Sequence, residues 1–202
     1  MKIKICGITN MEDAVLAAEL GADALGFIFV KSSPRHIHPS AARKIIQELP
    51  PFVVPVGVVA DFTHEDIVDL IEETGIGCVQ FHGNESPKQL VKLPVPVYKS
   101  FHVGKNFNPE NLRWYKGFTY LLDTEVEGAL GGTGKTFDWN IAVTAKTYGR
   151  IILAGGLNPE NIAEAVKKVQ PYAVDVNSGV ESVVGKKDRN KLERLFKTIR
   201  SL

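Results

Sequence analysis

Residues 150–180 read RIILAGGLNPENIAEAVKKVQPYAVDVNSGV, and they contain one complete strand–helix–strand unit. A short apolar run ends in two glycines, an Asn-Pro pair then precedes a helical segment, and a second apolar run follows. Both runs are almost continuously hydrophobic rather than alternating, which is typical of parallel strands buried on both faces. The stretch therefore predicts two parallel β-strands joined by a helix.

The same unit recurs along the whole chain. Eight apolar runs alternate with segments that carry helix start and stop signals, and a last helix is expected over residues 187–202, with Leu202 on its buried face. The expected strands cover residues 2–6, 24–30, 52–60, 77–81, 95–101, 118–123, 150–154 and 172–176. A doubly wound sheet rarely uses so many strict repeats, whereas a (β/α)8 barrel does. We predict an α/β fold, a single (β/α)8 TIM barrel over residues 1–202, with its active site at the carboxyl-terminal ends of the strands.

The composition fits one globular domain and limits its partners. The 202 residues are 44% hydrophobic and 23% charged, and 24 Lys plus Arg balance 23 Asp plus Glu. This balance predicts no nucleic-acid partner, and no apolar run approaches the ~18 residues that span a bilayer. Cys6 and Cys78 cannot form a disulfide framework, and the start MKIKICGIT lacks an apolar signal region, so we expect a cytoplasmic protein without membrane contact.

Three polar residues at strand ends are candidates for chemistry, because the βα loops of such barrels carry the active site. Cys6 ends the first strand, where its thiol is either a general base or a small buried core residue. Asp123 follows the apolar TYLL and is either the matching general acid or a loop cap. Asp175 lies inside YAVDVNSG, where a charge is costly unless it faces a polar mouth, so we expect it to contact substrate.

Two glycine-rich turns, AGGLNPENI and VNSGVES, follow the seventh and eighth strands. Their backbone N–H groups would converge on one anion, and a phosphate site at this pair of loops is frequent in the fold. The alternative is two ordinary tight turns. We predict that a phosphate is bound by Gly155, Gly156, Asn177, Ser178 and Gly179.

The remaining rim residues complete the expected site. Arg35 in SPRHIHPS can clamp a carboxylate, and we assign Gln80 and His82 at the end of the fourth strand to substrate binding. His36 and His38 have no acidic residue nearby and form a poor metal site, so no metal and no cofactor are expected.

Residues 128–138, GALGGTGKTFD, look at first like a phosphate-binding P-loop. The motif needs four residues between its first glycine and Gly-Lys-Thr, and counting back from Gly134 reaches an alanine instead. The preceding strand also ends well before, at Asp123. These glycines therefore indicate a long loop suited to folding over the barrel mouth rather than a nucleotide site.

In order and spacing, several motifs together resemble the phosphoribosylanthranilate isomerase family from end to end. They are KICGIT (4–9), GADALGFIF (21–29), SPRHI (33–37), VQFHGNE (79–85), LLDT (121–124), GGTGKTFDW (131–139), LAGGLNPENI (153–162) and DVNSGVE (175–181). The resemblance implies a cofactor-free Amadori rearrangement of N-(5-phosphoribosyl)anthranilate to 1-(2-carboxyphenylamino)-1-deoxyribulose 5-phosphate, in tryptophan biosynthesis.

The resemblance also implies roles for single residues. Cys6 matches the family's general base and Asp123 its general acid. Arg35 is expected to hold the anthranilate carboxylate, Asp175 to contact the amine or ribose, and the two glycine-rich turns to hold the phosphate. Asn177 departs from the family pattern, in which serine is more common.

Other interpretations remain open at this point. Another phosphosugar barrel, such as a pentose-phosphate epimerase or indoleglycerol-phosphate synthase, would need metal ligands or a catalytic lysine, and Lys99 alone stands at a comparable strand end. A barrel that binds a phosphorylated ligand without turnover is a third interpretation. Cys6 could also act as a covalent nucleophile. Barrels of this size occur as monomers and as dimers, so a homodimer is open as well.

Overall fold

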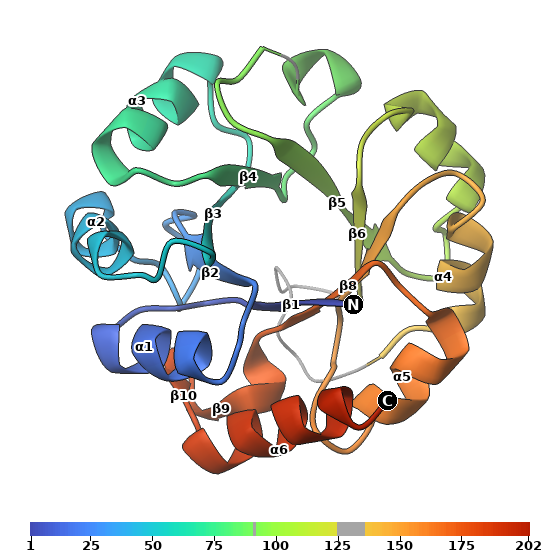
Figure 1. The fold of residues 1–202 in the computed structure, drawn as a ribbon. Coiled ribbons are helices and arrows are strands. Elements are labelled where there is room, and N and C mark those ends of the chain that lie inside the picture. Colours follow the sequence, from blue (N-terminus) through green and yellow to red (C-terminus); the bar gives the residue numbers. More distant parts are fainter. Residues whose placement is uncertain (91, 125–135) are drawn as a thin grey trace.

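Eight parallel strands close into a barrel in which each strand pairs with its neighbours in sequence and β8 pairs with β1 (Figure 1). The computed structural model describes residues 1–90, 92–124 and 136–202. The strands are β1 (Lys2–Ile5), β2 (Ala24–Ile28), β3 (Val54–Val59), β4 (Cys78–Phe81), β5 (Val97–Val103), β6 (Tyr120–Thr124), β7 (Ile151–Leu153) and β8 (Ala173–Val176). The predicted (β/α)8 architecture is confirmed.

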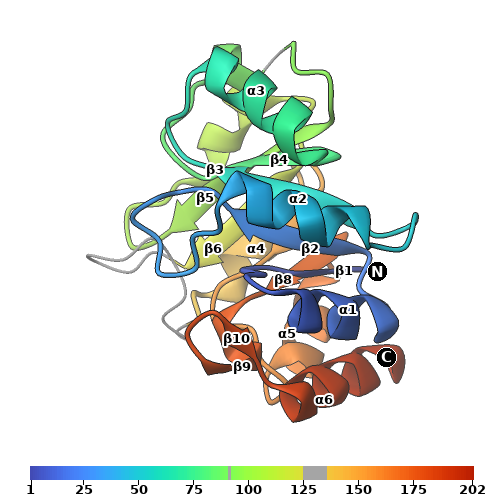
Figure 2. The same ribbon diagram turned by 90° about the vertical axis from the view of Figure 1, so that its left-hand side faces the viewer.

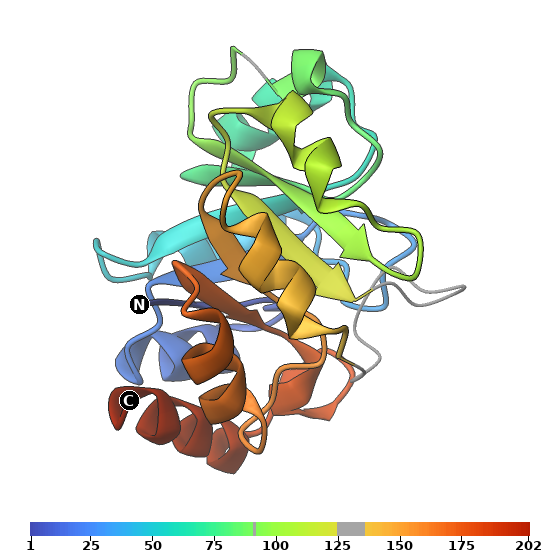
Figure 3. The same ribbon diagram turned by 90° about the vertical axis from the view of Figure 1, so that its right-hand side faces the viewer.

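The helices surround the barrel, and both chain termini lie at the same end of it (Figures 1, 2 and 3). The α-helices are α1 (Met11–Glu19), α2 (Pro39–Gln47), α3 (His64–Thr74), α4 (Trp139–Ala145), α5 (Ile162–Val169) and α6 (Arg189–Arg200). The connections after β4 and β5 contain the 3-10 helices η1 (Pro87–Leu90) and η2 (Pro109–Tyr115) instead. None of the helices within the described ranges is long and apolar enough to cross a membrane.

Side-chain caps set several helix ends as the sequence indicates. Thr63 and Asp66 form a reciprocal capping box at the start of α3. Gly75 ends that helix with a φ of 77°, in the left-handed region that favours glycine. The start of α5 differs from expectation, because Asn158 accepts hydrogen bonds from the backbone of Glu160 and Asn161 and so caps a turn before the helix.

Some boundaries differ from the sequence predictions. Phe52 lies before β3 and its surface is 93% exposed, and β5 continues through His102, which was expected to follow the strand. Leu202 is exposed beyond the end of α6, so its predicted burial is wrong. The sequence prediction also missed a short antiparallel hairpin of β9 (Glu181–Val183) and β10 (Lys186–Lys187), which follows the 3-10 helix η3 (Ser178–Val180).

The core has two parts, because strand residues alternate between the two faces of the barrel wall. One face packs against the helices in a large apolar cluster that includes Ile3 and Ile5 of β1. The other face points into the barrel interior, where Val56, Tyr98, Leu121, Ile152 and Ala173 belong to a second apolar cluster. A separate cluster of Cys6, Ile28 and Val58 comes from later strand positions, which places it toward the carboxyl-terminal ends.

Candidate active site

A cavity of about 380 Å³ opens at the carboxyl-terminal ends of the strands. Every residue that the sequence predicted for the site lines it. Its polar lining includes Cys6, Arg35, Gln80, His82, Asp123, Gly155, Gly156, Asp175, Asn177, Ser178 and Gly179. Apolar side chains such as Ile28, Val30 and Val58 complete the wall. The fold therefore brings together residues that are up to 173 positions apart in the chain.

The Cys6 thiol is buried at 5% exposure, yet it lines this cavity. Burial raises the pKa of Cys6, while the nearby Lys4 ammonium acts in the opposite direction. Gly26 on the neighbouring strand makes room for both groups. A Cβ at Gly26 would lie 2.6 Å from the Cys6 sulfur and 3.0 Å from Lys4 Nζ. The sulfur and the ammonium are thus close neighbours.

Asp123 occupies the next-to-last position of β6 and faces the same cavity. Burial raises the pKa of its carboxyl to about 6, and the charge of Asp175 adds to this effect. The backbone N–H of Thr124 donates to Asp123 Oδ1 at 2.8 Å and partly offsets the increase. A carboxyl that titrates near neutral pH is suited to general acid catalysis.

Asp175 forms a buried ion pair that sequence reasoning did not foresee. Lys4 and Asp175 are register partners in the β1–β8 pair, and Lys4 Nζ lies 2.7 Å from Asp175 Oδ2. Burial favours neutral lysine, but Asp175 holds the pKa of Lys4 well above its ordinary value. Asp175 Oδ1 is buried and has no hydrogen-bond partner among the described residues. The signal for Lys4 was its place two residues before Cys6, on the same face of the strand.

Gln80 and His82 link the barrel interior to the cavity. Gln80 Oε1 lies 3.0 Å from Lys4 Nζ and 2.9 Å from the Tyr98 hydroxyl, and Gln80 Nε2 lies 3.0 Å from His82 Nδ1. His82 Nε2 in turn lies 4.0 Å from Asp123 Oδ2. These two residues thus connect the Lys4–Asp175 pair to Asp123.

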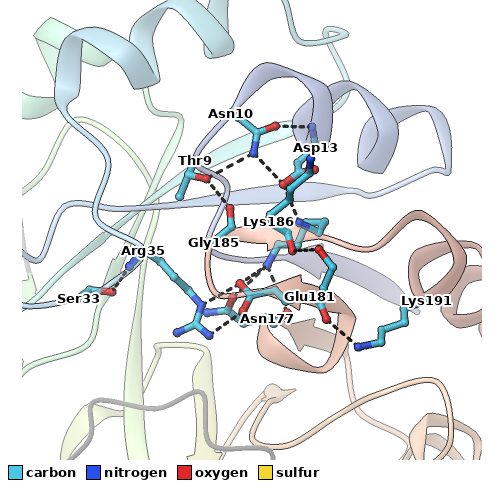
Figure 4. Close-up of polar contacts among 12 residues, drawn as sticks. Thr9, Asn10, Asp13, Ser33, Arg35, Asn177, Glu181, Gly185, Lys186 and Lys191 are labelled. Carbon is cyan, nitrogen blue, oxygen red and sulfur yellow. Dashed lines mark hydrogen bonds and ion pairs between the residues drawn. The ribbon is translucent and has the colours of Figure 1, made fainter.

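Arg35 reaches the cavity from the loop after β2, but one edge of its guanidinium is already paired. Its Nε and Nη2 donate to the two carboxylate oxygens of Glu181 at 2.8 and 2.7 Å (Figure 4). Glu181 also accepts from Lys187 at 3.1 Å. The sequence analysis missed both partners, because they come from the unforeseen β9–β10 hairpin.

Asn177 is held in the same network. Lys187 Nζ lies 3.1 Å from Asn177 Oδ1 and 3.2 Å from its backbone oxygen (Figure 4). A Cβ at Gly7 would lie 2.5 Å from Asn177 Oδ1, and Gly7 has a φ of +73°. The Asn177 side chain therefore packs against the loop after β1, and residues 177–179 form part of the cavity wall.

The two glycine-rich turns meet at this wall. Gly155 and Gly156 have φ values of 82° and 65°, a conformation that L side chains rarely adopt. A Cβ on Gly179 would collide with the backbone carbonyl of Leu157. The turns after β7 and β8 are thus packed against each other, as a shared anion site would require.

Other candidates are placed elsewhere. Lys99 does not line the cavity; its Nζ donates to the backbone oxygens of Gly83 and Ser100 and lies 3.3 Å from Glu85. Among the described residues, no group of three or more His, Cys, Asp and Glu side chains could hold a metal ion. Most of the glycine-rich segment 128–138 lies outside the described residues.

The chain is similar to known proteins over nearly its whole length. The family model for N-(5'-phosphoribosyl)anthranilate isomerase matches residues 3–198. An N-(5'-phosphoribosyl)anthranilate isomerase of Geobacter sp. strain M21 is 50% identical over 201 residues, which cover 100% of this chain and 98% of the relative.

Two solved structures are similar over the full length. Phosphoribosyl anthranilate isomerase from Thermotoga maritima superposes with a TM-score of 0.94 at 42% identity, covering 100% of both chains. An isomerase in complex with reduced 1-(o-carboxyphenylamino)-1-deoxyribulose 5-phosphate has a TM-score of 0.90 at 40% identity, again over 100% of both chains. The chain belongs to the N-(5'-phosphoribosyl)anthranilate isomerase family.

Proposed function

We propose that this chain converts N-(5-phosphoribosyl)anthranilate to 1-(2-carboxyphenylamino)-1-deoxyribulose 5-phosphate in tryptophan biosynthesis, with Asp123 as general acid and Cys6 as general base. The observation that carries the assignment of these roles is that one cavity contains both a thiol and a carboxyl with a pKa raised to about 6. A general acid must still hold its proton near the working pH, and a pKa near 6 allows this.

In the first step, Asp123 protonates the oxygen of the furanose ring. The bond between C1′ and that oxygen breaks, its electron pair stays on the oxygen, and the lone pair of the anthranilate nitrogen forms a C=N bond. The products are an open-chain iminium ion and the Asp123 carboxylate. The charge of the iminium then acidifies the proton on C2′.

In the second step, the Cys6 thiolate removes the C2′ proton. The electron pair of that C–H bond forms a C1′–C2′ double bond, and the C=N electrons return to nitrogen, which gives a neutral enolamine. Tautomerisation of the enolamine yields the ketone. Lys4 favours the thiolate through its positive charge, although burial keeps the pKa of Cys6 above its ordinary value. Each positioned proton transfer is worth about 10²–10⁴ in rate.

The cavity wall supports a binding mode for the rest of the substrate. The Nη1 edge of Arg35 is not used by Glu181 and can donate to the anthranilate carboxylate. Asp175 Oδ1, which has no hydrogen-bond partner in the described part of the chain, can accept from the amine or a ribose hydroxyl. The backbone N–H groups of the paired glycine-rich turns can hold the phosphate.

A steady-state assay tests the proposal. Conversion of phosphoribosylanthranilate is followed as loss of its fluorescence, with wild type, Cys6→Ala and Asp123→Asn run side by side. We expect kcat/KM to decrease by about 10²–10⁴ in each variant, because each lacks one proton-transfer group. Circular dichroism and a thermal scan check that the variants are folded.

Each outcome separates the interpretations. Substantial activity in either folded variant refutes the role of that residue. Binding of the substrate by wild type without turnover would instead support a non-catalytic phosphosugar barrel. A covalent adduct on Cys6, detected by mass spectrometry during turnover, would indicate a nucleophile rather than a base.

We propose that residues 1–202 form one domain and that the protein is cytoplasmic. Light scattering on the purified protein distinguishes a monomer from the homodimer that the sequence leaves open.

A further inference from the structure

A chain of hydrogen bonds runs across the barrel interior as far as His82, whose Nε2 lies 4.0 Å from Asp123 Oδ2. It starts at Lys4 on β1 and Tyr98 on β5, passes through Gln80 on β4, and continues through His82 just beyond β4. Gln80 is 2% exposed and Tyr98 is 7% exposed, so solvent does not compete for these contacts. The last pair, His82 and Asp123, lines the cavity.

The first contacts determine the orientation of the Gln80 amide. An ammonium group has only donors, so the Gln80 atom 3.0 Å from Lys4 Nζ must be the carbonyl oxygen. The Tyr98 hydroxyl donates to the same oxygen at 2.9 Å. Consequently the amide nitrogen faces His82, and no other orientation gives Lys4 an acceptor there.

The amide orientation in turn determines which His82 nitrogen carries the proton. An amide NH2 has only donors, so His82 Nδ1, 3.0 Å away, must be the acceptor. In a neutral imidazole the other nitrogen then holds the hydrogen. His82 is therefore an Nε2–H donor, and this nitrogen lies 4.0 Å from Asp123 Oδ2.

The surroundings keep this imidazole neutral. Burial lowers the pKa of His82 to about 3, and His102, Lys4 and Lys99 contribute in the same direction. The His102 ring stands edge-on to His82, with 4.9 Å between the ring centroids. His82 thus carries no second proton near neutral pH, and its remaining function in the cavity is to donate a hydrogen bond through Nε2.

We propose that His82 is a positioning residue whose Nε2–H, fixed by Gln80, stabilises the Asp123 carboxylate that forms when Asp123 protonates the substrate. This inference rests on the proposed function. The 4.0 Å separation is longer than a hydrogen bond, so a movement of about 1 Å is needed, and the charge that develops on Asp123 favours it. His82 keeps its proton throughout, while the O–H bond of Asp123 breaks and the substrate oxygen gains the hydrogen.

The opposite tautomer would work against the reaction. If Nδ1 held the hydrogen, Nε2 would present a lone pair to Asp123 and would compete with the substrate for the acid's proton. It would also offer no donor to the carboxylate afterwards. The chain from Lys4 and Tyr98 through Gln80 excludes this arrangement.

The tautomer can be measured without any turnover. Long-range 1H–15N correlation spectra of the 15N-labelled protein distinguish Nε2–H from Nδ1–H imidazoles, and His82→Asn assigns the signals. We expect Nε2–H in wild type between pH 5 and pH 8. In Gln80→Glu the residue facing Nδ1 can only accept, so we expect a proton on Nδ1. Tyr98→Phe is the matched control, because Lys4 still orients the amide, and we expect it to retain Nε2–H.

Kinetics and a carboxyl titration test whether His82 stabilises the Asp123 carboxylate. His82→Asn keeps an acceptor for Gln80 but removes the donor toward Asp123, whereas His82→Gln keeps an N–H at about the position of Nε2. A hydrogen bond to a charged group supports a decrease in kcat of about ten- to a hundredfold in His82→Asn and a smaller one in His82→Gln. The 13C-detected pKa of the Asp123 carboxyl should rise in His82→Asn, because the carboxylate loses a donor.

Three results would overturn the proposal. They are an Nδ1–H tautomer in wild type, an unchanged tautomer in Gln80→Glu, and wild-type kcat with an unchanged Asp123 titration in His82→Asn. If wild type does not isomerise phosphoribosylanthranilate, the proposed function fails instead. The tautomer measurement then still tests whether Gln80 fixes His82.

Discussion

The cavity has an aspartate on each of two walls, and the groups that surround the two carboxyls differ. On the wall formed by β8 and β1, Asp175 is 2.7 Å from the buried Lys4 ammonium. On the wall formed by β6 and the end of β4, Asp123 has a backbone N–H from Thr124 and a neutral His82 at 4.0 Å. Within the described ranges, Asp175 forms an ion pair with a lysine, whereas the ring nearest to the Asp123 carboxyl is a neutral imidazole.

This difference indicates how one cavity can contain both an ion-paired carboxylate and a carboxyl that can act as an acid. A nearby cation favours the charged form of a carboxyl, whereas burial without a cation favours the neutral form. Burial, helped by the charge of Asp175, raises the pKa of Asp123 to about 6. Asp175 is ion-paired with Lys4, whereas the pKa of Asp123 is raised, so the two carboxyls can serve different roles in a reaction.

The largest change in the free energy of unfolding is expected when the Lys4–Asp175 ion pair is broken. Lys4→Met leaves Asp175 buried without its partner, which typically costs about 3–5 kcal/mol in the free energy of unfolding. Urea denaturation at pH 7 measures this cost. The matched control is Lys2→Met, because Lys2 also pairs with an aspartate, Asp23, at 2.6 Å, but its side chain is 60% exposed.

The control should leave the free energy of unfolding almost unchanged, since water screens exposed ion pairs. Equal destabilisation by Lys4→Met and Lys2→Met would contradict the account of the β8–β1 wall. It would mean that the buried Lys4–Asp175 pair contributes no more to stability than the exposed Lys2–Asp23 pair.

A smaller change in the free energy of unfolding, of opposite sign, is expected when Asp123 on the other wall is replaced. The pKa of Asp123 is raised in the folded protein, so its neutral form is favoured there. The associated stability is present below the unfolded pKa near 4 and is lost as the pH rises through about 6. Asp123→Asn removes this loss, and at pH 8 the variant should be more stable than wild type by up to about 3 kcal/mol.

The difference between Asp123→Asn and wild type should shrink as the pH decreases toward 4. Urea denaturation at pH 4, 6 and 8 gives the three points. A variant that is less stable than wild type at pH 8 would argue that Asp123 is held as a well-stabilised carboxylate.

The position of the Cys6 thiol in the cavity gives a further prediction. Gly26→Ala would place a Cβ 2.6 Å from the Cys6 sulfur, so the thiol must move. A displacement of about 1 Å at a reacting group costs about 10² in rate, and we expect that decrease in kcat. Gly77→Ala is the control, because its Cβ would meet nothing closer than 3.7 Å. Equal activities of the two variants would show that the sulfur position is not critical.

Much of the fold was predictable, because the strands of this barrel are buried on both faces and appear as continuous apolar runs. The spacing of these runs and the start and stop signals between them then indicated the helices. The β9–β10 hairpin was missed, because its strands are only three and two residues long and contain charged residues. Such a short ribbon has no buried apolar face, so its sequence shows no hydrophobic periodicity. Its existence depends on contacts with distant segments, such as Lys187 N–H to Asp13.

The sequence predicts which residues share the cavity, because the fold topology determines this. It does not predict which side chains pair with each other there. The ends of parallel strands meet at one end of a barrel, so Cys6 and Asp123 could be placed in one cavity from the sequence. The pairing of Arg35 with Glu181 and of Lys4 with Asp175 could not, because each links residues more than 140 positions apart through side-chain geometry.

The titration of Asp123 is the most direct test of whether this carboxyl can still hold a proton near neutral pH. In protein labelled with 13C at aspartate carboxyls, the signal that disappears in Asp123→Asn is followed from pH 3 to pH 9. We expect a midpoint at about 6. A midpoint near the ordinary value of 3.8 would contradict it, because Asp123 would then hold almost no proton to give to the substrate at neutral pH.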